Sequence, residues 1–416
     1  MYHRGSYWMK FNSKMTTVFF FLLTLCFEAI SVGATALPEL DYVPERSMTI
    51  RDNAGRHVIY RGVNARAKGI FDVNFDDGRL PLQNVPELTE DDFVEIKKLG
   101  FNYLRLPINW SGITPKPRQF SKAYVDRIIT VLDLAEKYDI QVLLDMHQDA
   151  YSKEIGEDGA PDWSIYPRGF DRNLGGDLGN LTLKRVSLDT QRAFASFWKN
   201  KNVKGKPIWE HYVDAMMFVL KHTAHHSAVA GIEIMNEPWL LHIVRMYPND
   251  VYTKGTNIQL LWSFYEYAIR KIRKAHKEIW IYIEPDVSKS AAVPFLIRDD
   301  QLFKATGLPK NPPWNTYKTV YAPHLYTLGM ALDGAWGTKL DPNDPGIKTS
   351  TEYSMVEAEQ IGAGFLLGEF GFTHRSSAYG ETLHNIMDYA DQYLFHTVQW
   401  LWKEASQSSW GFWNYN

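Results

Sequence analysis

The stretch Gly231-Ile-Glu-Ile-Met-Asn-Glu237 joins a short apolar run, Gly231–Met235, to two polar residues at its end. Most positions of the run are apolar in succession rather than alternating, which is typical of a parallel strand covered on both faces. The polar pair Asn236-Glu237 follows directly. This stretch therefore predicts a buried strand that ends in polar residues, and the same pattern recurs along the chain.

Seven further apolar runs are separated from this one and from each other by longer stretches of helical periodicity. The eight runs are His57–Val63, Tyr103–Ile108, Gln141–Met146, Gly231–Met235, Trp280–Ile283, Val320–Pro323, Phe365–Gly368 and Trp410–Trp413. The helical patterns include Thr89–Leu99, Ser121–Tyr138, Gln259–Lys277 and Glu381–Glu404. Together they predict an α/β fold, a closed (β/α)8 TIM barrel. A doubly wound open sheet is the alternative, although such sheets usually have fewer strands and carry a Gly-rich phosphate fingerprint.

The residues at the ends of the runs favour the closed barrel and indicate where a site would lie. The ends carry Asn64, Arg105, His147, Asn236 with Glu237, Glu284, His324 with Tyr326, Glu369 and Trp413. Each of these side chains can hydrogen-bond, ionise or stack on a ligand. A barrel gathers the carboxyl ends of its strands at one mouth, whereas an open sheet spreads them along an edge.

The length and charge of the chain fit one large domain with no polyanionic partner. A chain of 416 residues with 45% hydrophobic residues can bury a single large core. The formal net charge of −3, without long runs of one sign, disfavours nucleic acid and an anionic membrane surface as partners. The sequence leaves the oligomeric state open.

Residues 1–36 differ from the rest and predict a secretory signal peptide, with residues 37–416 as the catalytic domain. Three basic residues precede the apolar run Val18–Phe27, and Ala34-Thr-Ala36 offers small residues for cleavage. The run is about half of the ~20 residues that span a bilayer, which disfavours an uncleaved anchor. We therefore expect a protein that is secreted or lies in the lumen of the secretory or lysosomal pathway. Cys26 is the one cysteine, so the mature chain would carry no thiol.

Glu237 and Glu369 are the candidate catalytic residues. Breaking a glycosidic bond requires one carboxyl group that protonates the leaving oxygen and another that attacks or activates water. The two glutamates end the fourth and seventh runs, which lie roughly opposite each other in an eightfold barrel. A separation of ~5 Å would give retention of configuration and one of ~7–9 Å inversion. Two such glutamates in apolar contexts favour catalysis over ordinary ion pairing.

The neighbours of the two glutamates suggest a division of labour. Asn236 can bind a sugar 2-hydroxyl. Arg105 and Tyr326 can hold Glu369 ionised, because a cation and a hydroxyl donor both favour the carboxylate. Like-charge repulsion from Glu369 should then raise the pKa of Glu237 and keep it protonated as the acid.

Other chemistries find less support. His147 and His324 raise the question of a metal, but no His-Glu-x-x-His helix and no cysteine cluster occurs, so we predict neither a metal nor another cofactor. A serine triad is disfavoured because no Gly-x-Ser-x-Gly elbow occurs. Trp413, and with less support Trp239, could stack on the apolar face of a sugar or simply belong to the core.

Five motifs, taken together, resemble those of family five of the glycoside hydrolases. They are Leu104-Arg-Leu-Pro107, Asp145-Met-His147, Asn236-Glu-Pro238, His324-Leu-Tyr326 and Gly368-Glu-Phe-Gly371. The resemblance implies a retaining mechanism with a covalent glycosyl intermediate on Glu369. It also implies an arginine and a histidine of the site at Arg105 and His147.

Within that family the chain most resembles the endoglycoceramidases, which release an intact oligosaccharide from ceramide. The residues that carry this are His147-Gln-Asp-Ala-Tyr151, Gly159-Ala-Pro-Asp-Trp163 and Lys68. The resemblance implies a glycosphingolipid substrate, with Lys68 and Asp149 binding sugar hydroxyls. From the residues alone, a solvated ion pair between Lys68 and Asp149 is an equal alternative.

The apolar stretch Trp239–Val244 after Glu237 could form a wall for the ceramide tails and bring the protein into peripheral contact with a lipid surface. An amphipathic helix packed against the barrel is the alternative. The chain also ends at Asn416, soon after Trp413, so we expect the barrel to end at its eighth strand without the final helix. The sequons at Asn109 and Asn180 leave only Asn180 as a fair glycan acceptor, because Asn109 falls at the predicted barrel mouth.

Three functions follow for comparison with the structure. The first is hydrolysis of the β-linkage between oligosaccharide and ceramide. The second is a polysaccharide endo-β-glycanase, a glucanase or mannanase, with the same catalytic pair in an open groove. The third is a glycolipid-binding barrel without catalysis.

Overall fold

The structure of the chain is a computed structural model. The structure describes residues 50–51, 54, 56–71, 85–156, 158–172, 184–185, 187–240, 256–287, 312–327, 329–330, 340–372, 376–404 and 410–414. All of them belong to the compact unit Tyr42–Asn416. The predicted signal peptide with Cys26, the sequon at Asn180 and residues 241–244 of the apolar stretch lie outside the described residues.

Eight parallel strands close into a barrel, as the sequence predicts. They are β3 (Arg61–Asn64), β4 (Tyr103–Asn109), β5 (Gln141–His147), β8 (Val229–Glu233), β9 (Ile281–Ile283), β10 (Thr319–Tyr321), β12 (Gly364–Leu367) and β14 (His396–Gln399). Each strand pairs with the next in chain order, and β14 returns to β3, where Val398 lies opposite Gly62. The barrel has no free edge, which removes the unpaired backbone groups of an open sheet.

Four short two-stranded sheets accompany the barrel. They are β1 (Ile50–Arg51) with β2 (His57–Val58), β6 (Asn202–Val203) with β7 (Lys206–Pro207), β11 (His324–Leu325) with β13 (Glu369–Phe370), and β15 (Lys403–Glu404) with β16 (Trp413–Asn414). The pair β11–β13 is parallel and continues the chain beyond the barrel strands β10 and β12. It therefore extends the barrel wall toward the mouth.

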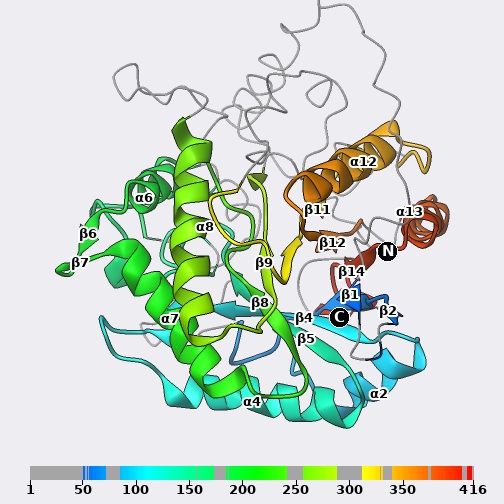
Figure 1. The fold of residues 1–416 in the computed structure, drawn as a ribbon, viewed down its shortest axis with the longest axis horizontal. Coiled ribbons are helices and arrows are strands. Elements are labelled where there is room, and N and C mark those ends of the chain that lie inside the picture. Colours follow the sequence, from blue (N-terminus) through cyan, green and yellow to red (C-terminus); the bar gives the residue numbers. More distant parts are fainter. Residues whose placement is uncertain are drawn as a thin grey trace, which may run out of the picture. The chain divides into compact units, whose positions relative to one another are not determined.

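Helices cover the strands on the outside (Figure 1). They are α2 (Glu90–Lys98), α3 (Trp110–Ile113), α4 (Lys122–Lys137), α6 (Leu188–Trp198), α7 (Ile208–Thr223), α8 (Thr256–Ala275), α12 (Pro345–Gln360) and α13 (Tyr379–Tyr393), with the 3-10 turn η1 (Asp162–Ser164). Within the described residues, no helix is long and apolar enough to span a bilayer.

The helix boundaries follow from capping chemistry. At the start of α2, Thr89 and Asp92 form a capping box, in which the Asp92 carboxylate accepts a hydrogen bond from the Thr89 backbone N–H. The helix stops before Gly100, whose φ of +84° favours glycine. Ser121 accepts a hydrogen bond from the Tyr124 N–H and begins α4 in the same way. These helices agree with the predicted segments Thr89–Leu99 and Ser121–Tyr138.

Alternate residues of the strands face the inside of the barrel, because successive side chains of a strand point to opposite faces. On β4, Leu104 and Leu106 pack outward in the layer between strands and helices, whereas Tyr103 packs inward. The inward apolar layer contains Tyr103, Leu143, Tyr282, Val320, Leu366 and Val398. Two residues further along the strands, the same face carries the polar groups of the site.

One predicted strand and one predicted helix are wrong. The eighth barrel strand is β14 (His396–Gln399), not the run Trp410–Trp413, and Trp413 instead belongs to β16, which pairs with β15. The predicted helix over residues 381–404 ends at Tyr393, because Leu394 adopts a left-handed conformation with φ 55° and the chain then enters β14. Within residues 400–404 and 410–414, no helix follows β14.

Candidate active site

Most of the predicted strand-end residues gather at the carboxyl ends of the barrel strands, but Arg105 lies deeper and Trp413 follows no barrel strand. Asn64 is the last residue of β3 and His147 the last of β5. Arg105 is not at the end of β4 but third in the strand, and it is completely buried inside the barrel. The site therefore has a floor of buried charge beneath its mouth.

Arg105 is the centre of that floor. Its Nη1 donates to Glu369 Oε1 at 2.6 Å and to Asn64 Oδ1 at 3.0 Å. Its Nη2 donates to Asn236 Oδ1 at 2.8 Å and lies 3.1 Å from Asp145 Oδ2. The sequence pairs Arg105 with Glu369, and the structure brings the two together.

Both oxygens of Glu369 accept hydrogen bonds. Oε1 accepts from Arg105, and Oε2 accepts from the Tyr326 hydroxyl at 2.9 Å. Glu369 lies opposite His324 in the register of β13 and β11. A Cβ on the preceding Gly368 would come within 3.3 Å of the His324 ring, so a glycine permits this close approach. The carboxylate is thus held in one orientation from two sides.

Glu237 lies beside Glu369 and is almost buried, with 16% of its side chain exposed. Its Oε1 is 3.0 Å from His324 Nδ1. One carboxylate oxygen of Glu237 and one of Glu369 lie within 4.8 Å of each other. The backbone of Glu237 has φ 43°, a left-handed conformation that is costly for a residue with a Cβ.

Three hydrogen bonds hold the backbone around Glu237. The amide of Gln148 donates to the carbonyl oxygens of Asn236 and Glu237 at 2.8 and 2.9 Å. The Glu237 N–H donates to Glu284 Oε2 at 3.1 Å. These contacts stabilise a conformation that the isolated chain would disfavour.

Burial, and after it the negative charge of Asp149, raise the pKa of Glu237 to about 7. The direction agrees with the expectation from sequence, but the cause differs. The expected repulsion from Glu369 is not among the main causes. Glu237 can therefore carry a proton near neutral pH because of its own surroundings and Asp149.

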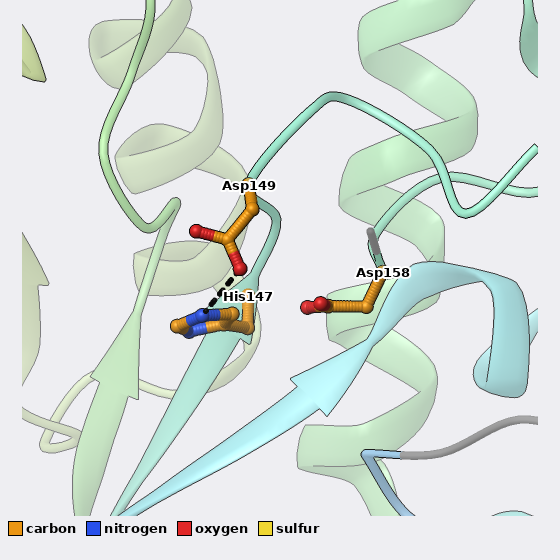
Figure 2. Close-up of side chains that lie close together, drawn as sticks. All are labelled: His147, Asp149 and Asp158. Carbon is orange, nitrogen blue, oxygen red and sulfur yellow. Dashed lines mark ion pairs between the residues drawn. The ribbon is translucent and has the colours of Figure 1, made fainter. Parts of the chain in front are cut away.

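His147 and Asp149 form a second polar group (Figure 2), and the charge of Asp149 acts on Glu237. His147 Nδ1 is 2.5 Å from Asp145 Oδ2, and its Nε2 is 3.5 Å from Asp149 Oδ2. Although burial opposes a charge on His147, the Asp145 and Asp149 carboxylates raise its pKa well above the usual value. Asp149 also pairs with Arg185, 2.7 Å from its Oδ1. Asp149 is therefore held as an anion between two cations.

His147, Asp149 and Asp158 are close enough to bind a metal ion in principle, since one ligand atom of each lies within 4.8 Å of the others. Figure 2 shows their side chains converging. A protonated imidazole has no lone pair for a metal, and the Arg185 guanidinium already occupies one oxygen of Asp149. Proton and guanidinium would thus compete with a cation, and the expectation that no metal takes part stays a prediction.

The contacts that the structure describes for Lys68 and Trp413 are with residues other than these. Lys68 is exposed, and its Nζ is 3.2 Å from Glu87 Oε1. Asp149 pairs with Arg185 instead, so the suggested ion pair between Lys68 and Asp149 does not form. Trp413 is 48% exposed and follows no barrel strand, which removes the reason for placing it at the mouth. The binding roles of Lys68 and Trp413 stay predictions.

The residue that does follow the eighth strand is Trp400. Its ring stacks on His147 with centroids 5.7 Å apart and an interplanar angle of 12°. The Arg66 guanidinium lies 5.8 Å from the same indole. Sequence reasoning missed Trp400 because it assigned residues 381–404 to one helix.

Four further residues complete the site: the sequence named Glu284 only as a strand-end residue and Asp145 only within a motif, and it did not single out Glu233 or Arg185. Asp145, Glu233 and Glu284 contact Arg105, and Arg185 contacts Asp149. Asp145 stands two residues before His147, and Glu284 two residues after the inward-facing Tyr282, so strict alternation along the strands would have pointed to both. No comparable signal in the sequence points to Arg185.

Two further expectations concern the rim. Asn109 is buried and its amide donates to the Phe71 carbonyl at 2.6 Å, which agrees with its rejection as a glycan acceptor. Of the apolar stretch 239–244, Leu240 is buried and Trp239 is half-buried against the core. Because 241–244 lie outside the described residues, the choice between a lipid wall and a packed helix stays open.

Comparison with known families agrees with this fold and site. The family model described as Cellulase (glycosyl hydrolase family 5) matches residues 70–406 of the chain. This range contains the whole barrel except β3, together with both candidate catalytic glutamates. The chain therefore belongs to glycosyl hydrolase family 5, a family of glycoside hydrolases.

Among curated proteins, the chain is similar to several endoglycoceramidases. It is 29% identical over 288 residues to endoglycoceramidase I of Rhodococcus hoagii (strain 103S), which covers 68% of this chain and 52% of that protein. It is 33% identical over 126 residues to the endoglycoceramidase of Hydra vulgaris, covering 30% of this chain and 23% of the relative. The chain thus spans about half the length of the first of these relatives.

Solved structures give the same fold. Endo-glycoceramidase II from Rhodococcus sp., in a complex with ganglioside GM3, superposes with a TM-score of 0.69 at 22% identity, covering 87% of this chain and 77% of that one. An endogalactoceramidase superposes with a TM-score of 0.66 at 25% identity, covering 86% and 74%.

Proposed function

We propose that this chain is a retaining glycoside hydrolase that cleaves the β-glycosidic bond between the oligosaccharide and the ceramide of glycosphingolipids by double displacement. One observation carries the proposal: oxygens of Glu237 and Glu369 lie within 4.8 Å of each other, with different surroundings. A short separation between two carboxyl groups suits direct attack, because a water between them would need ~6.5–9.5 Å.

In the first step, Glu369 attacks the anomeric carbon while the Glu237 carboxyl donates its proton to the glycosidic oxygen. The bond to the lipid alcohol breaks, and a glycosyl ester forms on Glu369. Arg105 and Tyr326 fix the attacking carboxylate. The raised pKa of Glu237 keeps the acid protonated up to about pH 7.

In the second step, Glu237, now a carboxylate, takes a proton from water, and the oxygen of that water attacks the anomeric carbon. Glu369 leaves and the sugar is released with its original configuration. Asn236 accepts from Arg105 through its side-chain Oδ1, and its Nδ2 donates one hydrogen to the Gln148 carbonyl. In this proposal, the second hydrogen of Nδ2 donates to the sugar 2-hydroxyl. Trp400 and His147 form one wall of the sugar pocket.

The lipid part of the substrate is proposed from relatives and from sequence. The relatives named endoglycoceramidase support an oligosaccharide linked to ceramide. Contact with a lipid surface through the apolar stretch 239–244 would let such a protein reach its substrate. The segment 1–36 supports a secreted or lumenal location, in the secretory or lysosomal pathway, where glycosphingolipids are accessible.

A polysaccharide endo-β-glycanase is the second candidate, because the matching family model is described as Cellulase. The same catalytic pair would serve a glucan or mannan. The two candidates differ only in the protein surface that binds the substrate beyond the scissile bond. Ceramide needs an apolar wall, whereas a sugar chain needs exposed aromatic side chains.

The test is product analysis with purified protein. Fluorescent ganglioside, cellulose and mannan are incubated separately, and products are identified by chromatography and mass spectrometry. Intact oligosaccharide plus ceramide is expected, with activity at least roughly a thousandfold lower in Glu369→Gln because an amide cannot supply the attacking carboxylate. Cleavage of polysaccharide alone would mean that the substrate is a glucan or mannan and not a glycolipid. Binding of ganglioside without products would favour a non-catalytic binder.

Two substrates with different leaving groups distinguish the roles of the two glutamates. Glu237→Gln should lose most activity on glycolipid, whose alcohol needs a proton, but much less on an aryl glycoside with an acidic phenol. Glu369→Gln should lose activity on both substrates. Equal losses for both variants on both substrates would contradict the assignment of acid and nucleophile.

A further inference from the structure

Arg105 contacts more acid than one guanidinium can neutralise. Glu233, Glu369, Asp145 and Glu284 approach its nitrogens at 2.6, 2.6, 3.1 and 3.3 Å. Their side chains are at most 6% exposed, so water contributes little to stabilising them. A buried carboxylate without a matching cation is costly.

Two of the four acids have other partners. Asp145 is paired with His147, whose imidazole it keeps charged. Glu369 receives the Tyr326 hydroxyl in addition to Arg105. This leaves Glu233 and Glu284 to share what remains of the Arg105 charge.

The four carboxylate oxygens of Glu233 and Glu284 differ in the hydrogen-bond donors that they contact. Glu233 Oε2 accepts from Arg105 Nε at 2.6 Å, but Glu233 Oε1 is buried and finds no hydrogen-bond donor in the described part of the chain. Glu284 Oε2 accepts from the Glu237 N–H, and Glu284 Oε1 lies 3.3 Å from Arg105 Nη2. An oxygen of Glu233 and one of Glu284 lie within 4.8 Å of each other. A proton on one carboxyl group would give the other an O–H donor.

We propose that Glu233 and Glu284 share one proton in a carboxyl–carboxylate hydrogen bond, and that this pair positions the backbone of Glu237 and leaves Arg105 to Glu369. Both are positioning residues, since both are buried and act through Arg105 and the backbone of Glu237. The expected effect on turnover rests on the proposed function, whereas the existence of the shared proton does not depend on it.

The surroundings of the pair support a retained proton. Burial and a neighbouring carboxylate, Asp145 for Glu233 and Glu233 for Glu284, outweigh the opposing charge of Arg105. Together they raise the pKa of Glu233 to about 7 and that of Glu284 well above its usual value. His324 Nε2 lies 3.3 Å from Glu284 Oε1, but burial lowers the pKa of His324 to about 3, so this imidazole supplies no positive charge. Two adjacent buried carboxyl groups with one shared cation ionise in separate steps.

The shared proton has a consequence for the geometry of the site. A fully ionised Glu284 would draw the Arg105 guanidinium toward itself and away from Glu369. With the proton, the contact of Arg105 to Glu284 stays long at 3.3 Å and that to Glu369 short at 2.6 Å. Glu284 Oε2 remains available for the N–H of Glu237, which holds that residue at φ 43°.

The first test compares two substitutions of nearly equal size at Glu233. In Glu233→Gln, the amide oxygen can accept from Arg105 and the NH2 can donate to Glu284, as a protonated carboxyl does. In Glu233→Leu, both contacts are lost. Turnover (kcat) in the leucine variant should fall at least roughly tenfold further than in the glutamine variant, with KM changed less than kcat. Equal losses in both variants would overturn the proposal.

The second test needs no turnover. With 13C-labelled glutamate and the Glu237→Gln variant, which removes the proton of the acid, infrared spectra at about pH 7 should contain a protonated carboxyl band. The band should vanish when Glu233→Gln is added and persist when the exposed Glu278→Gln is added instead. A folded Glu237→Gln protein without the band would refute the shared proton. If Glu237→Gln shows the band but the wild type cleaves no substrate, only the proposed function is refuted.

Discussion

Glu237 is placed where a carboxyl group is useful but unfavourable. It is nearly buried, it faces Asp149 through space, and its backbone is left-handed. Each of these features costs folding free energy, and functional sites commonly store such costs. The compensation comes from the hydrogen bonds of Gln148 and Glu284 to the adjacent backbone.

This placement predicts a stability that depends on pH. Because the pKa of Glu237 rises from 4.5 in the unfolded chain to about 7 in the folded one, the folded protein holds this proton longer. The contribution is therefore fully favourable below about pH 4.5 and is lost as the pH rises through about 7. Glu237→Gln does not titrate, so at about pH 8 it should be more stable than the wild type by on the order of 3 kcal/mol.

Denaturant unfolding of both proteins at about pH 4.5 and pH 8 measures this difference. The advantage of the variant should appear at the higher pH and shrink toward zero at the lower one. The matched surface change Glu278→Gln, at a fully exposed carboxylate, should show no comparable gain. An advantage for Glu237→Gln that is the same at both pH values would contradict the raised pKa.

At the level of single residues, the sequence predicts those that stand in recognisable motifs. Glu237, Glu369, Arg105, Asn236 and Tyr326 are brought together as expected. The second layer is harder to predict, because an acid such as Glu233 inside an apolar strand carries no motif. Its role depends on which strand neighbours it in three dimensions, and that is set by barrel closure.

Among the elements, β14 shows why a barrel strand can escape detection. Its residues, His396-Thr-Val-Gln399, include only one aliphatic side chain, so no apolar run marks it. Only Val398 faces the inner apolar layer, and His396, Thr397 and Gln399 are buried by their neighbours. The run Trp410–Trp413 is more apolar and is therefore predicted as the strand, although only its last residue, Trp413, is in a strand, where it pairs with Lys403 of β15.

The β3–β4 contact predicts a specific sensitivity. A Cβ on Gly62 would overlap the carbonyl oxygen of Tyr103 on the neighbouring strand, and the backbone cannot yield without disturbing the closed barrel. Gly62→Ala should destabilise the protein by roughly 2–4 kcal/mol. Gly380→Ala is the matched control, since Gly380 lies in the exposed first turn of α13 with nothing within 4 Å of its Cβ position.

Thermal unfolding with circular dichroism compares the two glycine variants. The control should be neutral or more stable by ~0.5–1 kcal/mol, because alanine favours a helix over glycine. If Gly62→Ala unfolds at the same temperature as the wild type, the close pairing of β3 and β4 at this position is wrong.

For the whole molecule, closure of the barrel is what turns dispersed residues into a site. Asn64, Arg105, Glu237 and Glu369 come from β3, β4, the segment after β8, and β13, and they are separated by up to three hundred residues of sequence. A ligand that contacts several of them can bind only when the strands are assembled. Binding should therefore stabilise the molecule against global unfolding.

A cyclic amine that mimics the charge of the oxocarbenium transition state is the ligand of choice for this prediction. Its cation would be attracted to the carboxylate of Glu369. At a concentration of about 100 times its Kd, it should stabilise the wild type by ~2.7 kcal/mol and raise the Tm by several degrees. In Glu369→Gln the attraction to the cation is lost while shape and hydrogen bonding to Asn236 remain, so the rise in Tm at the same concentration should fall by more than half. An equal rise in Tm in both proteins would mean that the amine binds elsewhere. The carboxylate of Glu369 would then not belong to the ligand-binding site that the closed barrel forms.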